Sequence, residues 1–367
     1  MDNICERLKN LRKDIGLNQE ALAEYLNIDQ SYLSQIESGH RKLTLSILDK
    51  LCALYACDMD YILCKNDNYT PLKVAFRSKN LSIEDLGGLA SINKLFKNMN
   101  YLKSNKNLDE SNYLVLDSTE LSENVNDLYL NSLAVELRRE WELSSYGSIN
   151  LFSTVLSKIP DLTILFYPMS ENTSGMCIKK DSNKIIAINS SMTKGRQRFT
   201  LAHELYHLYF QKDFNNLYIC KDSNRSEKEE EEANTFASFL LMPDQALKRY
   251  RKTNHIQVWD LSQVIEAEQY FQISHKALLY RLKNNNYIRE EEYDSLKTVQ
   301  ITQEAKKRGY SDELYCCSVK NQQYLVLGNY IRMIEENNDS NKLSEGKKRE
   351  LLLDGFRGDL VFYFSED

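Results

Sequence analysis

The stretch Arg196-Gln-Arg-Phe-Thr-Leu-Ala-His-Glu-Leu-Tyr-His-Leu-Tyr-Phe210 decides how the rest of the chain is interpreted. It contains His203-Glu204-x-x-His207, and no glycine or proline interrupts it, so we expect a helix. Residues four apart lie on the same face of a helix, where both imidazoles can reach one ion. Zinc accepts such a pair and needs a third protein ligand, which leaves its fourth position to water. The spacing therefore predicts a zinc site on this helix.

Glu204 lies about 100° around the helix from His203, beside the ion and not on it. This position suits a general base for a water whose pKa the metal lowers to about 7. The alternative is an amphipathic helix with two incidental histidines. The surrounding apolar residues indicate a buried helix, in which two histidines without a partner would be costly. We therefore favour the metal site.

The third ligand is expected on a second helix, in the segment Glu227-Lys-Glu-Glu-Glu-Glu-Ala-Asn-Thr-Phe-Ala-Ser-Phe-Leu-Leu-Met-Pro243. Its acidic start is favoured by the helix dipole, and most of these glutamates are expected to face solvent. Glu232 is the last acid before the apolar part, so it is the candidate that points inward. Cys220 lies between the two segments and is a weaker candidate.

These motifs resemble the ImmA/IrrE family of metallopeptidases. The resemblance rests on Arg198-Phe-Thr-Leu-Ala-His-Glu-x-x-His207, Glu232-Ala-Asn-x-Phe-Ala-x-x-Leu-Leu-Met-Pro243 and the upstream Ile186-x-Ile-Asn189, and it spans roughly residues 132–288. It implies that His203, His207 and Glu232 bind zinc and that Glu204 is the catalytic carboxylate. Tyr206, Tyr209 and Tyr218 are equal candidates for the residue that stabilises the oxyanion.

Three short strands are expected before the HExxH helix. They cover Leu162–Tyr167, Gly175–Ile178 and Lys184–Ile188, which have apolar and β-branched content, and Asp181-Ser-Asn183 predicts a hairpin between the last two. An exposed edge of such a sheet can pair with an extended substrate and place its peptide bond over the metal.

Residues 3–64 predict five short helices separated by turn residues, with Asn18 and Asp29 as N-caps. The pattern Asn18-Gln-Glu-Ala-Leu-Ala-x-x-Leu26 followed by Gln30-Ser-Tyr-Leu-Ser-Gln-Ile-Glu-Ser-Gly39 resembles the XRE family of helix-turn-helix regulators. The family places the second helix of the unit in the major groove. The resemblance implies DNA contacts by Gln19, Gln30, Ser31, Tyr32, Ser34 and Gln35, with Arg41 and Lys42 near phosphates.

The charge of this region leaves an alternative open. Residues 1–65 carry Lys or Arg at positions 7, 9, 12, 13, 41, 42, 50 and 65, against ten Asp and Glu. Nonspecific DNA affinity is built from phosphate contacts, so a net negative charge also fits a compact helical dimerisation module. We favour DNA binding, by a dimer on a palindromic operator.

The whole chain is predicted to be mainly α with a small β-sheet (α+β). We assign a helix-turn-helix domain to residues 1–65, a helical connector to 66–131, a zincin-like metallopeptidase domain to 132–290 and a mostly helical C-terminal region to 291–367. Within the connector, Gly87-Gly88 is expected to break a helix, and Asp359–Phe364 is expected to form a closing strand. His275 is expected to be a capping or surface residue.

Composition excludes several classes of protein. The formal net charge is −6 and the pI is about 5.6, so there is no overall basic surface for nucleic acid. No apolar run reaches transmembrane length and no signal peptide precedes the first helix, from which we expect a cytoplasmic protein without a membrane partner. The eight cysteines have no CxxC spacing and are expected to be buried thiols.

Two functions remain in view. The first is a DNA-binding transcriptional regulator carrying a zinc-dependent endopeptidase, which cleaves a repressor-type protein or itself in a stress or mobile-element response. The second is a transcription factor or antitoxin whose peptidase-like domain only senses a ligand or binds a partner.

Overall fold

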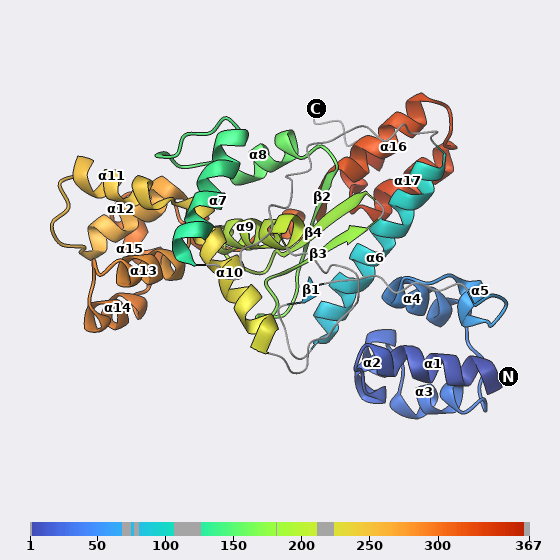
Figure 1. Ribbon diagram of the computed structural model, residues 1–367. Helices are drawn as coiled ribbons and strands as arrows, with labels where there is room; N and C mark the ends of the chain where they lie inside the picture. Colours follow the sequence, from blue (N-terminus) through green and yellow to red (C-terminus); the bar gives the residue numbers. More distant parts are fainter. Residues whose placement is uncertain are drawn as a thin grey trace.

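The computed structural model describes residues 2–67, 75–76, 81–105, 126–180, 182–210 and 224–362. A helical N-terminal bundle, a central sheet covered by helices on both faces, and a helical C-terminal part follow one another along the chain (Figure 1). The predicted class, mainly α with a small sheet, is confirmed. Within the described residues, no helix is both apolar enough and long enough to span a bilayer.

The N-terminal bundle contains the five predicted helices. Their bounds are α1 Asp2–Asp14, α2 Gln19–Leu26, α3 Gln30–Glu37, α4 Leu45–Tyr55 and α5 Met59–Ile62. Asn18 caps α2 by accepting a hydrogen bond from the Ala21 N–H, whereas Asp29 begins α3 without a side-chain cap. Asn27 ends α2 in the left-handed conformation, with φ of 59°, and this residue gives the tight turn between α2 and α3.

The connector contains a long helix that the glycine pair does not break. Helix α6 runs without interruption from Ile83 to Ser104, which corrects the predicted break. A Cβ at Gly87 would lie 2.5 Å from the Tyr167 hydroxyl oxygen, and a Cβ at Gly88 would lie 3.2 Å from the Met169 side chain. The two glycines therefore allow α6 to pack closely against the end of a strand, and packing compensates for their low helix propensity.

Within the part of the chain that the structure describes, the sheet has five strands in the order β1-β3-β4-β2-β5. Strands β2 Leu162–Tyr167, β3 Gly175–Lys180 and β4 Asn183–Asn189 are the three predicted strands, and β3 and β4 form the predicted antiparallel hairpin. Strands β2 and β4 are parallel. The edge strands β1 Ala75–Phe76 and β5 Leu325–Gly328 come from distant parts of the chain and were not predicted.

The two faces of the sheet belong to different hydrophobic cores because side chains alternate along each strand. On one face Cys177, Ile186 and Ile188 pack with α7 Asp127–Glu140, α8 Leu151–Lys158, α9 Lys194–Phe210 and α10 Asn224–Leu241. On the other face Met176, Ile185 and Ala187 pack with α6, α16 Asn329–Asp339 and α17 Glu345–Asp354. This second core continues through α6 into the N-terminal bundle, so α6 joins the bundle to the sheet (Figure 1).

The remaining helices follow α10. They are α11 Asp244–Thr253, α12 Leu261–Phe271, α13 His275–Asn284, α14 Glu290–Lys297, α15 Ile301–Lys307, the short helices η1 Glu313–Tyr315 and η2 Lys320–Gln322, and the terminal α18 Gly358–Val361. Helix α18 lies where a closing strand was predicted for Asp359–Phe364, and that prediction was wrong for the described part. The sheet edge beside β2 is already taken by β5, and α18 packs against α17 instead.

Candidate metal centre and nucleic-acid surface

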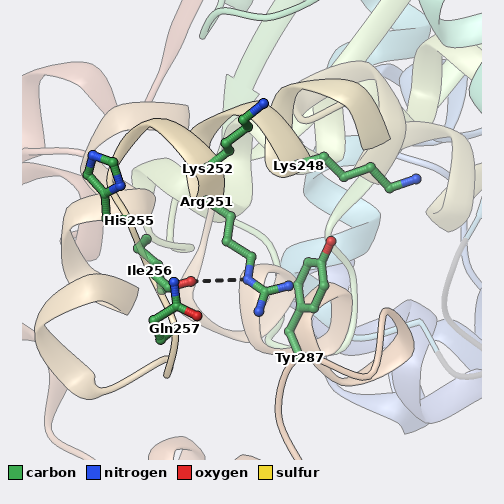
Figure 2. A pocket seen from close by; sticks show the side chains of 7 residues that line it. All are labelled: Lys248, Arg251, Lys252, His255, Ile256, Gln257 and Tyr287. Atoms are coloured by element: carbon green, nitrogen blue, oxygen red, sulfur yellow. Dashed lines mark hydrogen bonds between the residues drawn. The ribbon is translucent and has the colours of Figure 1, made fainter.

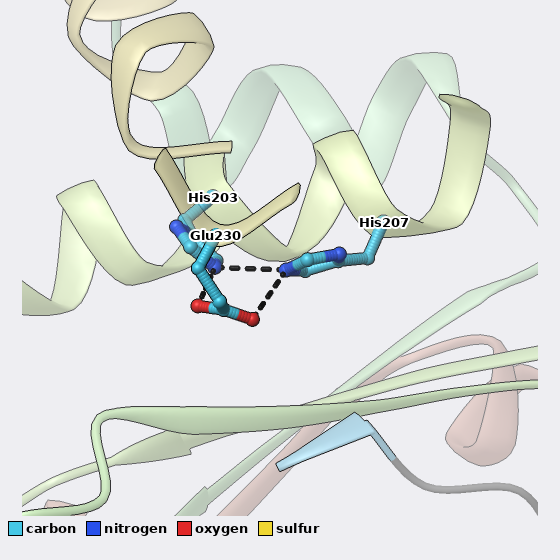
Figure 3. A group of neighbouring side chains, drawn as sticks. All are labelled: His203, His207 and Glu230. Carbon is cyan, nitrogen blue, oxygen red and sulfur yellow. Dashed lines mark hydrogen bonds and ion pairs between the residues drawn. The ribbon is translucent and has the colours of Figure 1, made fainter. Parts of the chain in front are cut away.

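The metal cluster is formed by His203, His207 and Glu230 (Figure 3). One ligand atom from each lies within 4.8 Å of the others. The two histidine Nε2 atoms are 2.9 Å apart, and the Glu230 oxygens lie 3.3 Å from His203 Nε2 and 3.4 Å from His207 Nε2. The imidazoles come from one face of α9, as their four-residue spacing requires. The carboxylate comes from α10.

The hydrogen bonding of His203 fits a metal ligand. Its Nδ1–H donates to the Asn234 Oδ1 at 3.1 Å, which leaves the Nε2 lone pair directed at the cluster. A partner of this kind fixes the tautomer and ring orientation of a zinc-bound histidine. Two nitrogens and one carboxylate that converge on one point are the donor set of a catalytic zinc site, so the residues present fit zinc.

Burial sets the electrostatics of the cluster. His203 and His207 are buried, and the side chain of Glu230 keeps 35% of its exposure. Burial alone would raise the pKa of the Glu230 carboxyl, but the two imidazoles, whose Nε2 atoms lie 3.3 and 3.4 Å from its oxygens, hold that pKa below its ordinary value. The carboxylate is therefore ionised and ready to bind a cation.

Glu232, the residue expected as third ligand, is not in this cluster. It is mostly buried, as expected, but it accepts a hydrogen bond from the Tyr206 hydroxyl at 2.8 Å and lies 3.7 Å from the Lys228 ammonium. Residues two apart on a helix are about 200° apart around its axis, so Glu230 and Glu232 cannot face the same point. Asn234, by contrast, is four residues from Glu230 and shares its face.

Sequence reasoning missed both Glu230 and Asn234. The choice of Glu232 followed from its place next to the apolar part of the segment and from the family resemblance. The four-residue spacing of Glu230 and Asn234 shows that these two residues share a face of the helix, but it does not show that this face is turned toward the histidines.

Glu204 lies beside the cluster on the side of the sheet. A Cβ added to Gly175 on β3 would lie 3.0 Å from Glu204 Oε1, so glycine makes room for the carboxylate there. The Cys177 thiol hydrogen-bonds to Glu204, and burial and this carboxylate raise the pKa of the thiol well above its ordinary value. The neutral thiol can thus donate to Glu204 and hold it next to β3.

Other residues considered for the site are placed elsewhere or lie outside the described residues. Tyr206 donates to Glu232, and Tyr209 packs half-buried beside Phe210. Tyr218 and Cys220 belong to residues 211–223, outside the described ranges. The cysteines that are described are free thiols, but only Cys52, Cys57 and Cys177 are buried and Cys317 is exposed, so the expected burial was wrong for Cys317.

His275 is neither a cap nor a surface residue, which corrects its predicted role. Its Nδ1 lies 2.5 Å from Glu268 Oε1, and its Nε2 lies 3.0 Å from the Leu296 carbonyl oxygen. The Tyr315 hydroxyl donates to the other oxygen of Glu268 at 2.7 Å. Burial would lower the pKa of His275, but its hydrogen bond to Glu268 raises it overall, and burial also raises the pKa of Glu268. The hydrogen bonds of Glu268 to His275 and Tyr315 join α12, α13 and η1.

A separate hollow of about 370 Å³ lies at the end of α11 (Figure 2). It is lined by Lys248, Arg251, Lys252, His255, Ile256, Gln257 and Tyr287. Arg251 stacks on Tyr287, 4.5 Å from the ring centroid, and donates to the Ile256 carbonyl. The cationic side chains that line the hollow lie toward the C-terminal end of α11, where the helix dipole is negative. Their presence is explained by this dipole, so they do not by themselves define a ligand site.

Unlike the metal cluster, which is buried, the expected DNA-contacting surface of the helix-turn-helix domain is exposed. Gln30, Ser31, Ser34 and Gln35 are exposed along one side of α3. Arg41 stacks on half-buried Tyr32 at 4.0 Å from its ring centroid, and Lys42 is exposed beside it. These side chains are brought together on one face, with two cations at its margin.

Gln19 is placed differently from the other expected DNA contacts. Its side-chain amide donates to Glu37 Oε2 at 2.8 Å, and Arg12 donates to both oxygens of Glu37 at 2.7 and 3.0 Å. Burial would raise the pKa of Glu37, but these hydrogen bonds lower it overall. Gln19 therefore joins α2 to a buried ion pair that fixes α3 against α1.

The fold and the site define a helix-turn-helix domain joined to a metallopeptidase-type domain. Residues 8–62 match the helix-turn-helix family, and residues 159–283 match the metallopeptidase family described as the IrrE N-terminal-like domain. The chain contains one domain of each kind, which confirms both resemblances.

Individual relatives match parts of the chain. It is 36% identical over 64 residues to the HTH-type transcriptional regulator RamB of two Mycobacterium tuberculosis strains, covering 17% of this chain and 14% of the relative. It is 32% identical over 114 residues to the uncharacterized immunity region protein 2 of Bacillus phage phi105, covering 31% of this chain and 64% of the relative. The chain thus spans less than two thirds of the length of each of these relatives.

Proposed function

We propose that this protein is a DNA-binding transcriptional regulator that carries a zinc-dependent endopeptidase. The observation that carries the peptidase part is the cluster itself: two imidazoles and a carboxylate converge on one point, with the carboxylate of Glu204 beside it. His203, His207 and Glu230 would hold the zinc. When bound, zinc supplies Lewis acidity, which polarises a carbonyl and lowers the pKa of water.

The residues around the cluster have distinct roles in this proposal. Glu204 takes a proton from the attacking water at a carboxylate oxygen and returns it to the leaving amine. Asn234 orients the His203 ring, and Cys177 holds Glu204 next to β3. The buried environment of α9 excludes bulk water, which strengthens these interactions.

The proposed substrate is a repressor-type protein or the chain itself, in a stress or mobile-element response. Its support is the pairing of a helix-turn-helix and a metallopeptidase domain in one chain, and the name of the phage relative, which refers to an immunity region.

The peptidase is tested with Glu204→Gln, which keeps the shape of the side chain and removes the base. We expect this variant to retain zinc and to lose about 10²- to 10⁴-fold of the activity. Protein N-termini are compared by mass spectrometry in cells that express the wild type or the variant. Termini that appear only with the wild type identify the substrate. An identical set of termini, with zinc bound in both proteins, would favour a non-catalytic sensor domain instead.

The DNA-binding part rests on the exposed polar face of α3. We propose that a homodimer reads a palindromic operator through Gln30, Ser31, Tyr32, Ser34 and Gln35, with Arg41 and Lys42 on phosphates.

Gln30→Ala with Gln35→Ala should remove specific binding to the promoter region of the protein's own gene, because each bidentate contact between glutamine and adenine contributes about 1–3 kcal/mol. Gln303→Ala, an exposed glutamine on α15, is the matched control. Electrophoretic mobility shift measures the loss, and unchanged binding by the double variant would refute these readers.

A further inference from the structure

Strand β1 comes from the connector between the N-terminal bundle and α6, yet it pairs with the sheet of the peptidase domain. Ala75 is opposite Cys177 and Phe76 is opposite Met176, in an antiparallel ladder. Among the described strands, β3 has β4 on its other side, so β3 would be the edge of the sheet without β1.

This edge is the one that adjoins the proposed catalytic carboxylate. Gly175 begins β3 next to Glu204, and Cys177 two residues later hydrogen-bonds to Glu204. The β1 backbone therefore pairs with β3 at Cys177, the residue whose thiol contacts Glu204. In Figure 3 the light blue strand β1 runs along the sheet beneath His203, His207 and Glu230. At the opposite edge of the sheet, β5 pairs with β2.

An extended substrate binds such an edge through its backbone, because main-chain hydrogen bonds to an unpaired strand need no particular side chains. On the proposed peptidase function, a substrate would add to β3 and bring its peptide bond beside Glu204. The antiparallel pairing of β1 with β3 uses the same backbone groups of β3.

We propose that β1 occupies the substrate-strand position of the peptidase site, so that this segment of the chain must leave before another extended polypeptide can be cut. The inference rests on the proposed peptidase function and adds a regulator to it. The occupant is covalently attached on one side to the DNA-binding bundle, which ends with α5 at Ile62, and on the other to α6, which begins at Ile83.

Tethering makes the internal strand a strong competitor. A segment held by short linkers acts at an effective concentration in the millimolar range. A free peptide at micromolar concentration therefore competes poorly while β1 is in place. Releasing β1 should raise the affinity for a free strand by about tenfold or more.

The experiment measures binding of one defined probe, a fluorescein-labelled synthetic peptide with the sequence of residues 70–81. The full-length, zinc-loaded Glu204→Gln protein is the parent, so that the probe is bound without being cut. Ala75→Pro with Phe76→Pro removes the backbone N–H of both residues, including the one that points at β3, and so opens the edge. Fluorescence anisotropy should show that the proline variant binds the peptide at least about tenfold more tightly than the parent does.

A second variant fixes the strand in place. Phe76→Cys with Met176→Cys places two cysteines at directly opposed positions, where Cα atoms lie roughly 4.5–5.5 Å apart and a disulfide can form. The oxidised protein should bind the peptide at least as weakly as the parent, and the reduced form of the same variant is its own control. Lys106→Pro with Asn107→Pro, in another part of the connector, controls for general effects of proline.

The outcomes separate this inference from the peptidase proposal. Equal peptide binding by the parent and the proline variant, or tight binding by the oxidised variant, would overturn the inference. Cleavage of the connector within the intact wild-type chain would overturn the blocking role. The peptidase proposal fails on a different measurement: zinc retained in His203→Ala at the wild-type level.

Discussion

The metal cluster and the exposed face of α3 meet opposite physical requirements. His203 and His207 are buried and each interacts with a neighbouring group, whereas Gln30, Ser34 and Gln35 are exposed on the bundle. A metal site needs donors held in one arrangement before the ion arrives, and packing between α9 and α10 provides it. A DNA-reading face needs polar side chains that remain available to base edges.

The two regions differ in which groups are held rigid. At the metal cluster the functional side chains themselves are fixed, by Asn234 and by the second helix. In the bundle the fixed groups lie behind the surface, in the Arg12–Glu37 ion pair, and the proposed readers are left free of it. Substitutions at the metal cluster should therefore change zinc binding directly. Substitutions of the Arg12–Glu37 pair should change DNA binding indirectly, through the position of α3.

The largest expected effect distinguishes two glutamates on one helix. Glu230→Gln should lower zinc affinity by more than about 100-fold, because losing a ligand costs more than losing the 10- to 100-fold contribution of an outer hydrogen-bond partner. Glu232→Gln is the matched control, since its amide still accepts from Tyr206. Competition against a chromophoric chelator measures both. Zinc loss in the Glu232 variant alone would restore the expectation from the sequence and remove Glu230 from the site.

The next effect concerns the ion pair behind the DNA-reading face. Glu37→Ala leaves Arg12 buried without its carboxylate and should destabilise the bundle by about 3 kcal/mol. The Glu37 pKa is lowered in the folded protein, so its contribution is present above the ordinary value of 4.5 and is lost as the pH falls through the folded pKa. Hydrogen exchange at α2 and α3 amides measures this, with exposed Glu24→Ala as control. Equal protection in both variants would show that the pair does not fix α3.

A smaller effect tests the hydrogen bond that orients His203. Asn234→Ala should weaken zinc binding by about 10- to 100-fold, in line with other outer partners of metal-bound histidines. Asn234→Asp keeps an acceptor for Nδ1–H and should restore most of the affinity. If both variants bind zinc as tightly as the wild type, packing alone orients the ring.

The smallest effect concerns the margin of the DNA-reading face. Arg41→Ala removes one proposed phosphate contact, so it should weaken binding to all sequences alike and reduce the slope of log K against log salt by about 1. Fluorescence anisotropy at several salt concentrations measures the slope, with exposed Lys13→Ala on α1 as control. A change in sequence preference without a change in slope would place Arg41 on a base instead.

Local patterns predicted the elements whose own residues decide their structure. The HExxH spacing predicted helix α9 with both imidazoles on one face. The β-branched content predicted β2, β3 and β4 with bounds within two residues of those observed. Turn residues gave the five helices of the bundle. The break at Gly87-Gly88 was wrong, because low helix propensity is a local quantity and close packing on Tyr167 and Met169 outweighs it.

Which residues form the metal site depends on how two helices are oriented, so local patterns did not predict it. Glu230 and Glu232 are equivalent acids in a run, and only the rotation of α10 against α9 chooses between them. The same holds for His275, whose partner Glu268 lies on another helix. Edge strands β1 and β5 are too short to show periodicity, and they exist because a neighbouring strand offers unpaired backbone groups.

The amino-acid sequence by itself determined that two histidines on one helix and a helix-turn-helix share this chain, since both follow from spacing within a few turns. Tertiary structure alone decided which carboxylate joins the histidines and which segment covers the sheet edge beside Glu204. The physical reason is that convergence of donors and pairing of strands depend on how distant elements are oriented, and that orientation is set by packing over the whole core.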